Sequence, residues 1–226
     1  MELRFCDDIG MFAWDRPIDN VYGTKGELLA SGSCVHATEW CKPNCYNEKL
    51  YKMYPNMRTK DIRNESQWQN VTGSEINAIL SRKKKNTKRA RGCTRGENIK
   101  DYEDIDRWED IAIANPDTDF WVPVRGWRDI FLRKEIEKRL FKYPNLAILA
   151  STDVTTTEKE WQELKEAGWS TMYVGDDKLE TTPLGERMFK CPKTFKKLKG
   201  HCGICKAGCF KSITLGQAVD VHLSQH

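Results

Sequence analysis

The chain has 226 residues, of which 31% are charged, 10% are aromatic and eight are Trp, and its formal net charge is +4. This length and aromatic content exclude a disordered chain and favour one folded domain, or one domain with a small appendage. The small net charge excludes a protein whose whole surface attracts polyanions, and no apolar run approaches the length of a membrane span.

Few regular elements can be predicted in the first third of the chain. Residues 27–30 have the composition of a short strand. Pro43 is well placed to open a helix whose apolar residues recur at helical spacing as far as Met53. Residues 55–73 are rich in Asn, Arg, Ser and Gln without strong periodicity, so we expect a connection there, followed by a helix that Ser74 caps.

Strands and helices alternate from about residue 88 to residue 175. Short apolar runs suited to strands lie at residues 90–95, 120–124, 146–150 and 171–174. Because neighbouring parallel strands need a helical crossover, the alternation predicts an α/β fold with a parallel sheet. We expect a partial (β/α) TIM-like barrel in residues 1–188, with an open doubly wound sheet as the alternative, and a cysteine-rich metal-binding tail in residues 189–226.

A basic run interrupts the middle of the chain. Residues 82–91 read RKKKNTKRAR, in which seven of ten positions are basic. Clustered positive charges can contact phosphates, so weak nucleic-acid binding is one interpretation. A solvated surface is the other, because no aromatic side chains interleave to stack on bases.

Four cysteines lie close together near the end of the chain. They are Cys191, Cys202, Cys205 and Cys209. The two residues between Cys202 and Cys205 let both sulfur atoms turn toward one metal, and thiolates select zinc or iron–sulfur clusters. Nine cysteines in a chain whose first residues lack the apolar core of a secretion signal favour metal binding over disulfides. We therefore predict a metal centre here, either a 4Fe–4S cluster or zinc.

A second group of cysteines precedes the predicted helix at Pro43. Cys34, Cys41 and Cys45 are separated by six and then three residues. A helix N-terminus beside thiolates favours their negative charge, and three thiolates could ligate three irons and leave a fourth iron open. Cys6 and Cys93 are the candidates for a fourth ligand, and Cys93 is favoured because its strand end should face the same rim. The alternative is that one or two of these cysteines belong to the core.

Polar side chains follow three of the predicted strands. In α/β barrels, ligands bind at the carboxyl ends of the strands. Glu97, Arg125 and Asp153 each follow a strand, and we expect them to meet the loop of Cys34–Cys45 on one rim and to bind a cofactor there. Each of them alone could instead serve the N-terminus of a helix, Asp153 above all.

Four segments, in the expected order, resemble the gene product 88 family of phage proteins, over roughly residues 30–210. They are Cys…Trp-Cys-x3-Cys-Tyr at Cys34–Tyr46; Gly96-Glu97 with Trp108 and Asn115-Pro-Asp-Thr-Asp-Phe120; Val124-Arg125 with Tyr143-Pro-Asn-Leu146 and Ser151-x-Asp153; and Cys191-Pro with Cys202-x2-Cys205. The resemblance implies a phage-encoded protein of the host cell cytoplasm. It favours iron–sulfur over zinc for both cysteine groups.

This family is similar in outline to radical S-adenosylmethionine enzymes, partial barrels with a cluster on the first strand–helix loop. The likeness implies that an open iron binds S-adenosylmethionine, and that rim residues hold its ribose and a substrate. Those enzymes typically space three cysteines by three and two residues, whereas the gaps here are six and three. The non-enzymatic alternative is a structural or electron-transfer metal protein that contacts nucleic acid or a host protein through residues 82–91.

Overall fold

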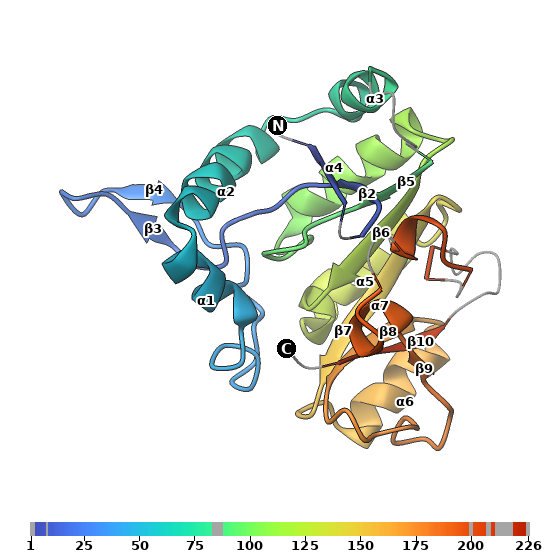
Figure 1. Cartoon of the computed structure of the whole chain (residues 1–226). Helices are drawn as coiled ribbons and strands as arrows, with labels where there is room; N and C mark the ends of the chain where they lie inside the picture. Colours follow the sequence, from blue (N-terminus) through green and yellow to red (C-terminus); the bar gives the residue numbers. More distant parts are fainter. Residues whose placement is uncertain are drawn as a thin grey trace.

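The structure is a computed structural model and describes residues 3–7, 9–82, 88–198, 201–206, 209–210 and 219–224. Seven helices and two short 3-10 helices surround an eight-stranded sheet in this part of the chain, and a two-stranded hairpin projects from one side (Figure 1). None of these helices is long and apolar enough to cross a membrane.

The main sheet has the strand order β1-β2-β5-β6-β7-β8-β10-β9. β1 and β2 pair antiparallel, and every other neighbouring pair is parallel. The predicted α/β class with a mostly parallel sheet is therefore confirmed. Edge strands β1 and β9 do not pair with each other among the described residues, so no closed barrel is seen. The strands are β1 (Arg4–Cys6), β2 (Met11–Ala13), β5 (Arg89–Arg91), β6 (Asp119–Val124), β7 (Leu146–Asp153), β8 (Ser170–Gly175), β9 (Phe189–Lys190) and β10 (Asp220–Ser224).

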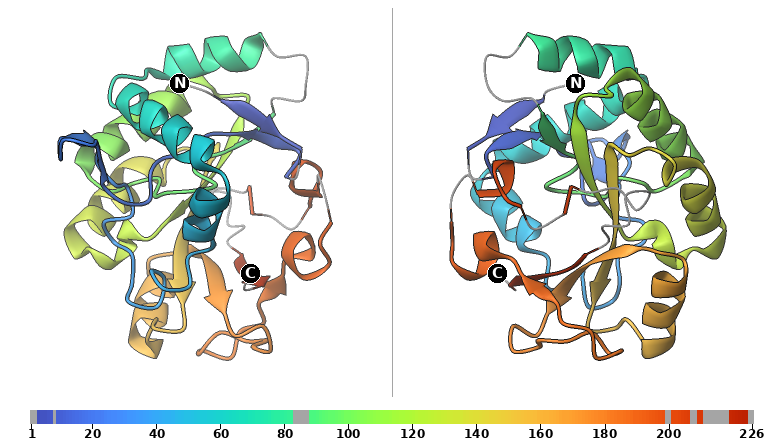
Figure 2. Two further views of the ribbon diagram at one scale, coloured as in Figure 1. Left: turned by 60° about the vertical axis from the view of Figure 1, so that its left-hand side comes forward. Right: turned by 90° about the vertical axis from the view of Figure 1, so that its right-hand side faces the viewer.

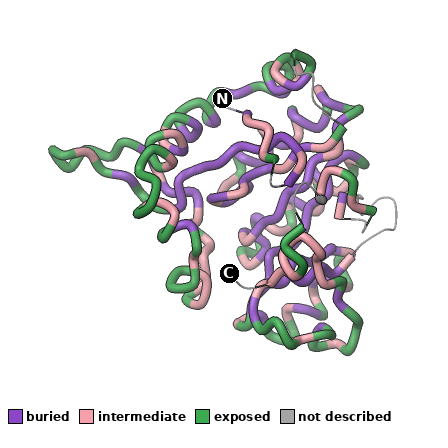
Figure 3. Tube along the Cα trace, viewed as in Figure 1, coloured by how far each residue is buried: buried purple, intermediate pink, exposed green. Residues whose placement is uncertain are grey.

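Most helices lie between consecutive strands or before β5. The small hairpin of β3 (Val21–Tyr22) and β4 (Leu28–Ala30) stands apart from the main sheet, and its tip is exposed (Figures 1 and 3). The α-helices are α1 (Tyr46–Met53), α2 (Pro55–Trp68), α3 (Gly73–Ser81), α4 (Tyr102–Ala114), α5 (Ile130–Leu140), α6 (Glu158–Glu166) and α7 (Pro192–Phe195), and the 3-10 helices are η1 (Gly126–Arg128) and η2 (His201–Gly203).

The prediction of a connection at residues 55–73 is wrong, because α2 occupies most of it. The reason lies in its buried face, which carries Asp61, Asn64, Glu65 and Trp68 and therefore shows no apolar periodicity. The strands predicted at 120–124, 146–150 and 171–174 fall inside β6, β7 and β8. Their side chains are almost all buried, as in strands that are covered on both faces (Figure 3).

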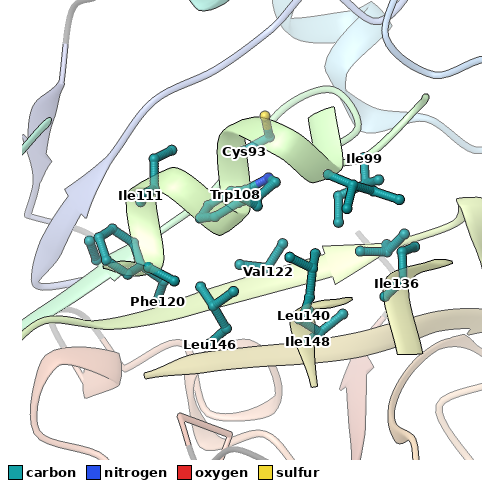
Figure 4. Close-up of a cluster of buried hydrophobic side chains, with 14 of the residues drawn as sticks. Cys93, Ile99, Trp108, Ile111, Phe120, Val122, Ile136, Leu140, Leu146 and Ile148 are labelled. Carbon is teal, nitrogen blue, oxygen red and sulfur yellow. The ribbon is translucent and has the colours of Figure 1, made fainter. Parts of the chain in front are cut away.

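Helices α4, α5 and α6 cover one face of the sheet, which we call the outer face. The predicted stripes of α4 and α5 pack there against β6 and β7, as Trp108, Ile136, Phe120 and Ile148 show (Figure 4). Trp14 continues this outer core toward α2, because its ring stacks 5.6 Å from Trp68 and 5.3 Å from Trp108, measured between centroids.

The opposite, inner face of the sheet has a separate apolar core. Alternate side chains of the strands face it, among them Met11, Trp121, Leu149 and Val221. The C-terminal cysteine segment, defined as residues 191–210, lies over this face (Figure 2). The predicted domain boundary after residue 188 directly precedes β9, which joins the main sheet through β10. The part of the chain after this boundary therefore supplies two strands of the sheet, and the C-terminal cysteine segment packs against its inner face.

Candidate metal centres at the rim and on the inner face

The rim loop, defined as residues 33–45, is held against the carboxyl ends of the central strands. The Ser33 hydroxyl accepts a hydrogen bond of 2.8 Å from the backbone N–H of Glu97, which follows β5. The Thr38 hydroxyl donates to Asp153 Oδ2 at 2.8 Å and accepts from the N–H of Cys41 at 3.0 Å. These contacts join the first cysteine group to the ends of β5 and β7.

The three predicted cofactor-binding residues meet at this rim. Arg125 donates through Nη1 to Asp153 Oδ2 at 2.5 Å, and its backbone N–H donates to Glu97 Oε2 at 2.9 Å. Their side chains do not serve as caps, because the capping side chains of α4, α5 and α6 belong to Asp101, Asp129 and Thr157. The carboxyl-end position in a parallel sheet accounts for their proximity.

The two rim carboxyls differ in their electrostatic surroundings. Burial raises the pKa of Glu97, although backbone N–H groups and Arg125 oppose the rise. Burial also acts on Asp153, but hydrogen bonds from Thr155 and Thr38 and the charge of Arg125 together leave its pKa below the ordinary value. Asp153 is therefore an anion at neutral pH, and it holds the Arg125 guanidinium in place.

The cysteines of the rim loop lie within electrostatic reach of one another. Burial raises the pKa of Cys34, and the charges of Glu97, Cys41 and Cys45 raise it further. Burial also raises the pKa of Cys41, while Arg125 opposes the rise. Cys34 is thus a protonated thiol in the metal-free chain at neutral pH, so metal binding there would release a proton.

The two candidates for a fourth ligand of this group lie in different places. Cys93 belongs to the outer core beside Trp108 and Ile99, is 3% exposed, and its sulfur lies 3.5 Å from the carbonyl oxygen of Glu97 (Figure 4). Cys6 lies on β1 and packs against the inner core together with the C-terminal cysteines. Cys93 is therefore buried in the outer core, next to the backbone of the rim residue Glu97.

The four C-terminal cysteines also share one neighbourhood. Burial raises the pKa of Cys202 to about 11, and Cys191 and Cys205 add to the rise. Burial likewise raises the pKa of Cys209 to about 12, with contributions from Cys191, Cys205 and Cys202. Cys191 is tied to β10 by its backbone N–H, which donates to the carbonyl of His222 at 2.8 Å.

The donor chemistry of both groups fits a sulfur-ligated metal, since zinc and iron–sulfur clusters take soft thiolate ligands and each group supplies at least three cysteines that are not in disulfides. Among the residues that the structure describes, no three His, Cys, Asp or Glu side chains are arranged closely enough to hold a metal ion. Metal binding would therefore require the thiols of each group to turn toward a common centre.

Two arginines of β5 project toward the inner face, and sequence reasoning missed their role: Arg89 contacts the C-terminal cysteine segment, and Arg91 contacts Trp121 of β6. Arg89 donates through Nη1 to the carbonyl oxygens of Cys202 at 3.2 Å and Cys205 at 2.8 Å. The Arg91 guanidinium stacks 4.3 Å from the Trp121 ring centroid. The signal lay in the Arg-Ala-Arg alternation of residues 89–91, which form β5 and place both arginine side chains on one face, although the predicted strand began only at residue 90.

Arg91 lies between the two cysteine groups. Its charge opposes the rise that burial causes in the pKa of Cys202, and it does the same for Tyr46, the residue after Cys45.

Sequence reasoning also missed a network of buried charges behind the rim. Arg16 contacts Glu65 at 2.6 Å and Asp104 at 2.8 Å, and all three side chains are at most 2% exposed. Arg95 bridges Asp15 at 2.6 Å and Asp61 at 3.0 Å. The polar face of α2 supplies two of these carboxylates, which explains why that helix lacks an apolar stripe.

Two surface cavities lie away from these groups. One of about 460 Å³ lies between α1, α2 and Ile18, and one of about 420 Å³ lies beside β9. Neither is lined by a cysteine or by the three rim residues, so they do not bear on the candidate centres.

Comparison with known proteins gives one finding. The family model described as gene product 88 matches residues 17–209, which include the rim loop, the three rim residues and the four C-terminal cysteines. No curated protein and no solved structure matches the chain.

Proposed function

The chain belongs to the gene product 88 family of phage proteins, and from this premise we propose that it is an iron–sulfur protein with two cysteine-ligated centres. The observation that supports the proposal is the grouping of seven cysteines into a set of three at the rim and a set of four on the inner face, each set within mutual electrostatic reach.

Cys191, Cys202, Cys205 and Cys209 would hold the inner-face centre. Four thiolates saturate a 4Fe–4S cluster, and a saturated cluster that is covered by protein transfers electrons without binding substrate. The chain contributes a firm support, because Cys191 is anchored to β10 and Arg89 holds the carbonyls of Cys202 and Cys205.

Cys34, Cys41 and Cys45 would hold the rim centre, with one coordination position left for a ligand. Cys93 and Cys6 pack into the two cores, which favours the three-cysteine form. A reduced cluster in this place would supply an electron to a bound molecule such as S-adenosylmethionine. We propose accordingly a redox or radical S-adenosylmethionine-like enzyme, whose open sheet is a partial barrel.

The rim residues would bind and orient that ligand. Arg125 is held by the ionised Asp153 and retains 12% side-chain exposure, so it can attract a carboxylate. Glu97 accepts three backbone hydrogen bonds. Its carboxyl group therefore holds the backbone of the rim in place and does not point toward a ligand. The proposed site would thus face its substrate with the Arg125 cation, and Arg128 lies beside it, 3.7 Å from Asp153 Oδ1.

The alternative is a non-enzymatic protein in which the metal, iron or zinc, has only a structural role. It would hold the C-terminal cysteine segment against the sheet. Four cysteines suffice for that role, and the contact of this segment with the inner core supports it. In this alternative the rim cysteines remain thiols, and residues 82–91 contact nucleic acid or a host protein.

Metal analysis of chain purified without oxygen tests the proposal. We expect about eight irons per chain for two clusters, and about four in the variant with Cys34, Cys41 and Cys45 changed to Ala. Cys93→Ala is the matched control and should keep the iron content of the parent. One zinc without iron would contradict the iron–sulfur proposal, and iron content unchanged by the triple substitution would contradict the rim centre.

A further inference from the structure

Two buried N–H donors on the inner face have no acceptor. They are Nε of Arg91 and Nε1 of Trp121, which form no hydrogen bond in the part of the chain that the structure describes. Buried donors are nearly always satisfied in folded proteins, so an unpaired one indicates a missing ligand or ion. Here two such donors occur side by side.

The two side chains come from paired positions of neighbouring strands. Arg91 of β5 is the register partner of Trp121 of β6, and both project from the inner face. The guanidinium lies over the indole ring, a stacking that holds both groups in one orientation. The indole is 7% exposed and lies 6.4 Å from the ring of Phe210, the residue after Cys209.

The C-terminal cysteine segment faces this pair. Cys191, Cys202 and Cys209 pack against the same apolar cluster that contains Trp121. The carbonyl oxygens of Cys202 and Cys205 already accept hydrogen bonds from Arg89, two residues before Arg91 on the same face. The cysteine sulfur atoms are further potential acceptors in this neighbourhood, because Cys202 is close enough to Arg91 for the guanidinium charge to act on its thiol. A neutral thiol accepts hydrogen bonds weakly, whereas metal-bound thiolates and cluster sulfides carry negative charge and accept them well.

We propose that Arg91 and Trp121 are positioning residues of the inner-face centre, where their N–H groups donate to its sulfur atoms and raise its reduction potential. The inference rests on the proposed iron–sulfur function. A reduced cluster carries one more negative charge than an oxidised one, so a buried cation and N–H donors stabilise the reduced form. Arg89 has a different task, because it donates to the backbone of the Cys-x2-Cys turn and its guanidinium lies 4.9 Å from the ring centroid of Phe210.

Redox titration of the full chain tests this assignment. Arg91→Gln should shift the potential of one of the two clusters to a more negative value and leave its iron content unchanged. Trp121→Phe keeps the ring but removes the N–H, and should shift the same potential in the same direction by less. Lys138→Gln, an exposed residue on α5, is the matched control and should shift neither potential.

Two further measurements show which cluster has the shifted reduction potential and whether N–H groups donate to its sulfur atoms. In a variant with Cys34, Cys41 and Cys45 changed to Ala, one cluster should remain. Adding Arg91→Gln to this variant should still make the reduction potential of that cluster more negative. The Fe–S stretching bands of the parent should move after exchange into deuterated water, and the movement should be smaller in Trp121→Phe. If both variants keep their iron and neither potential shifts, the inference is wrong. If the parent chain binds no iron, the proposed function itself fails.

Discussion

Two regions of the molecule differ in how their buried polar groups are paired. One is the charge network behind the rim, and the other is the inner face beneath the C-terminal cysteine segment. In the network, Arg16 and Arg95 each meet two carboxylates. On the inner face, the buried nitrogens Nε of Arg91 and Nε1 of Trp121 meet no acceptor among the residues that the structure describes. The first region is complete with protein atoms alone. The second has the chemistry of a site that a ligand completes.

The largest expected effect comes from breaking the network. Arg16→Ala leaves Glu65 and Asp104 buried without their main partner, and should lower the free energy of unfolding by about 3–5 kcal/mol. Chemical denaturation of the metal-free chain measures this loss. Lys159→Ala, at a side chain that is 87% exposed, is the control and should change stability by less than about 0.5 kcal/mol. A loss in Arg16→Ala no larger than the control would show that the network is not a stabilising unit.

The next effect separates the two arginines of β5. Arg89→Gln removes two hydrogen bonds to the Cys-x2-Cys turn, and should weaken metal binding about 10- to 100-fold. Competition with a chelator measures the affinity. Arg91→Gln should retain iron under the same conditions, because its partners are proposed to be sulfur atoms and not the backbone. Equal losses of metal in both variants would remove the distinction between them.

A smaller effect concerns pH. The partners Arg16 and Lys100 lower the pKa of Glu65 against the effect of burial, so its contribution to stability is present above about pH 4.5 and is lost as pH falls. Burial raises the pKa of Glu97, so its contribution has the opposite sign and is lost as pH rises through this range.

Denaturation of the metal-free chain between pH 3 and pH 7 tests both signs. Glu65→Gln should remove part of the rise of stability with pH, and Glu97→Gln should make the remaining rise steeper. Lys159→Ala should follow the parent curve. Parallel curves for the two Gln variants would contradict the difference between network and rim.

The smallest effect is expected for nucleic acid. Arg89 contacts the C-terminal cysteine segment and Arg91 stacks on Trp121, so at most five of the seven basic residues in 82–91 remain for phosphates. Residues 83–87 lie outside the described part of the chain. Changing Lys83, Lys84, Lys85 and Lys88 to Gln should weaken any binding at low salt and flatten its salt dependence. Unchanged binding in a fluorescence anisotropy titration would leave this run without a role in binding.

The sequence supports the α/β prediction because β6, β7, β8 and the helices between them bury apolar residues at regular spacing. It also places Glu97, Arg125 and Asp153 together, because the carboxyl ends of parallel strands share an edge. It does not reveal α2, whose buried face is charged, nor the contact of Arg89 with Cys202 across 113 positions. Such contacts depend on how distant segments pack, which local periodicity does not encode.

The same limit explains the fourth-ligand prediction. The predicted strand at residues 90–95 contains Cys93, whereas β5 ends at Arg91 and Cys93 follows it. Whether the Cys93 side chain is exposed, however, depends on whether it points toward Trp108 and Ile99 of the outer core. The residue types around Cys93 do not determine this direction. Grouping by short spacing was more informative, since cysteines a few residues apart are neighbours in the structure as well.

The sheet order near β9 has a consequence for synthesis on the ribosome. β9 pairs within the main sheet only with β10, which is inserted between β8 and β9 although it follows both in the chain. Cys191, at the end of β9, therefore gains its anchor on His222 only after residues 220–224 have left the exit tunnel. A nascent chain that stalls before this point carries every cysteine but lacks the strand that holds the first of the last four. If the inner face holds a metal, its site would accordingly be fully supported only after β10 has joined the sheet.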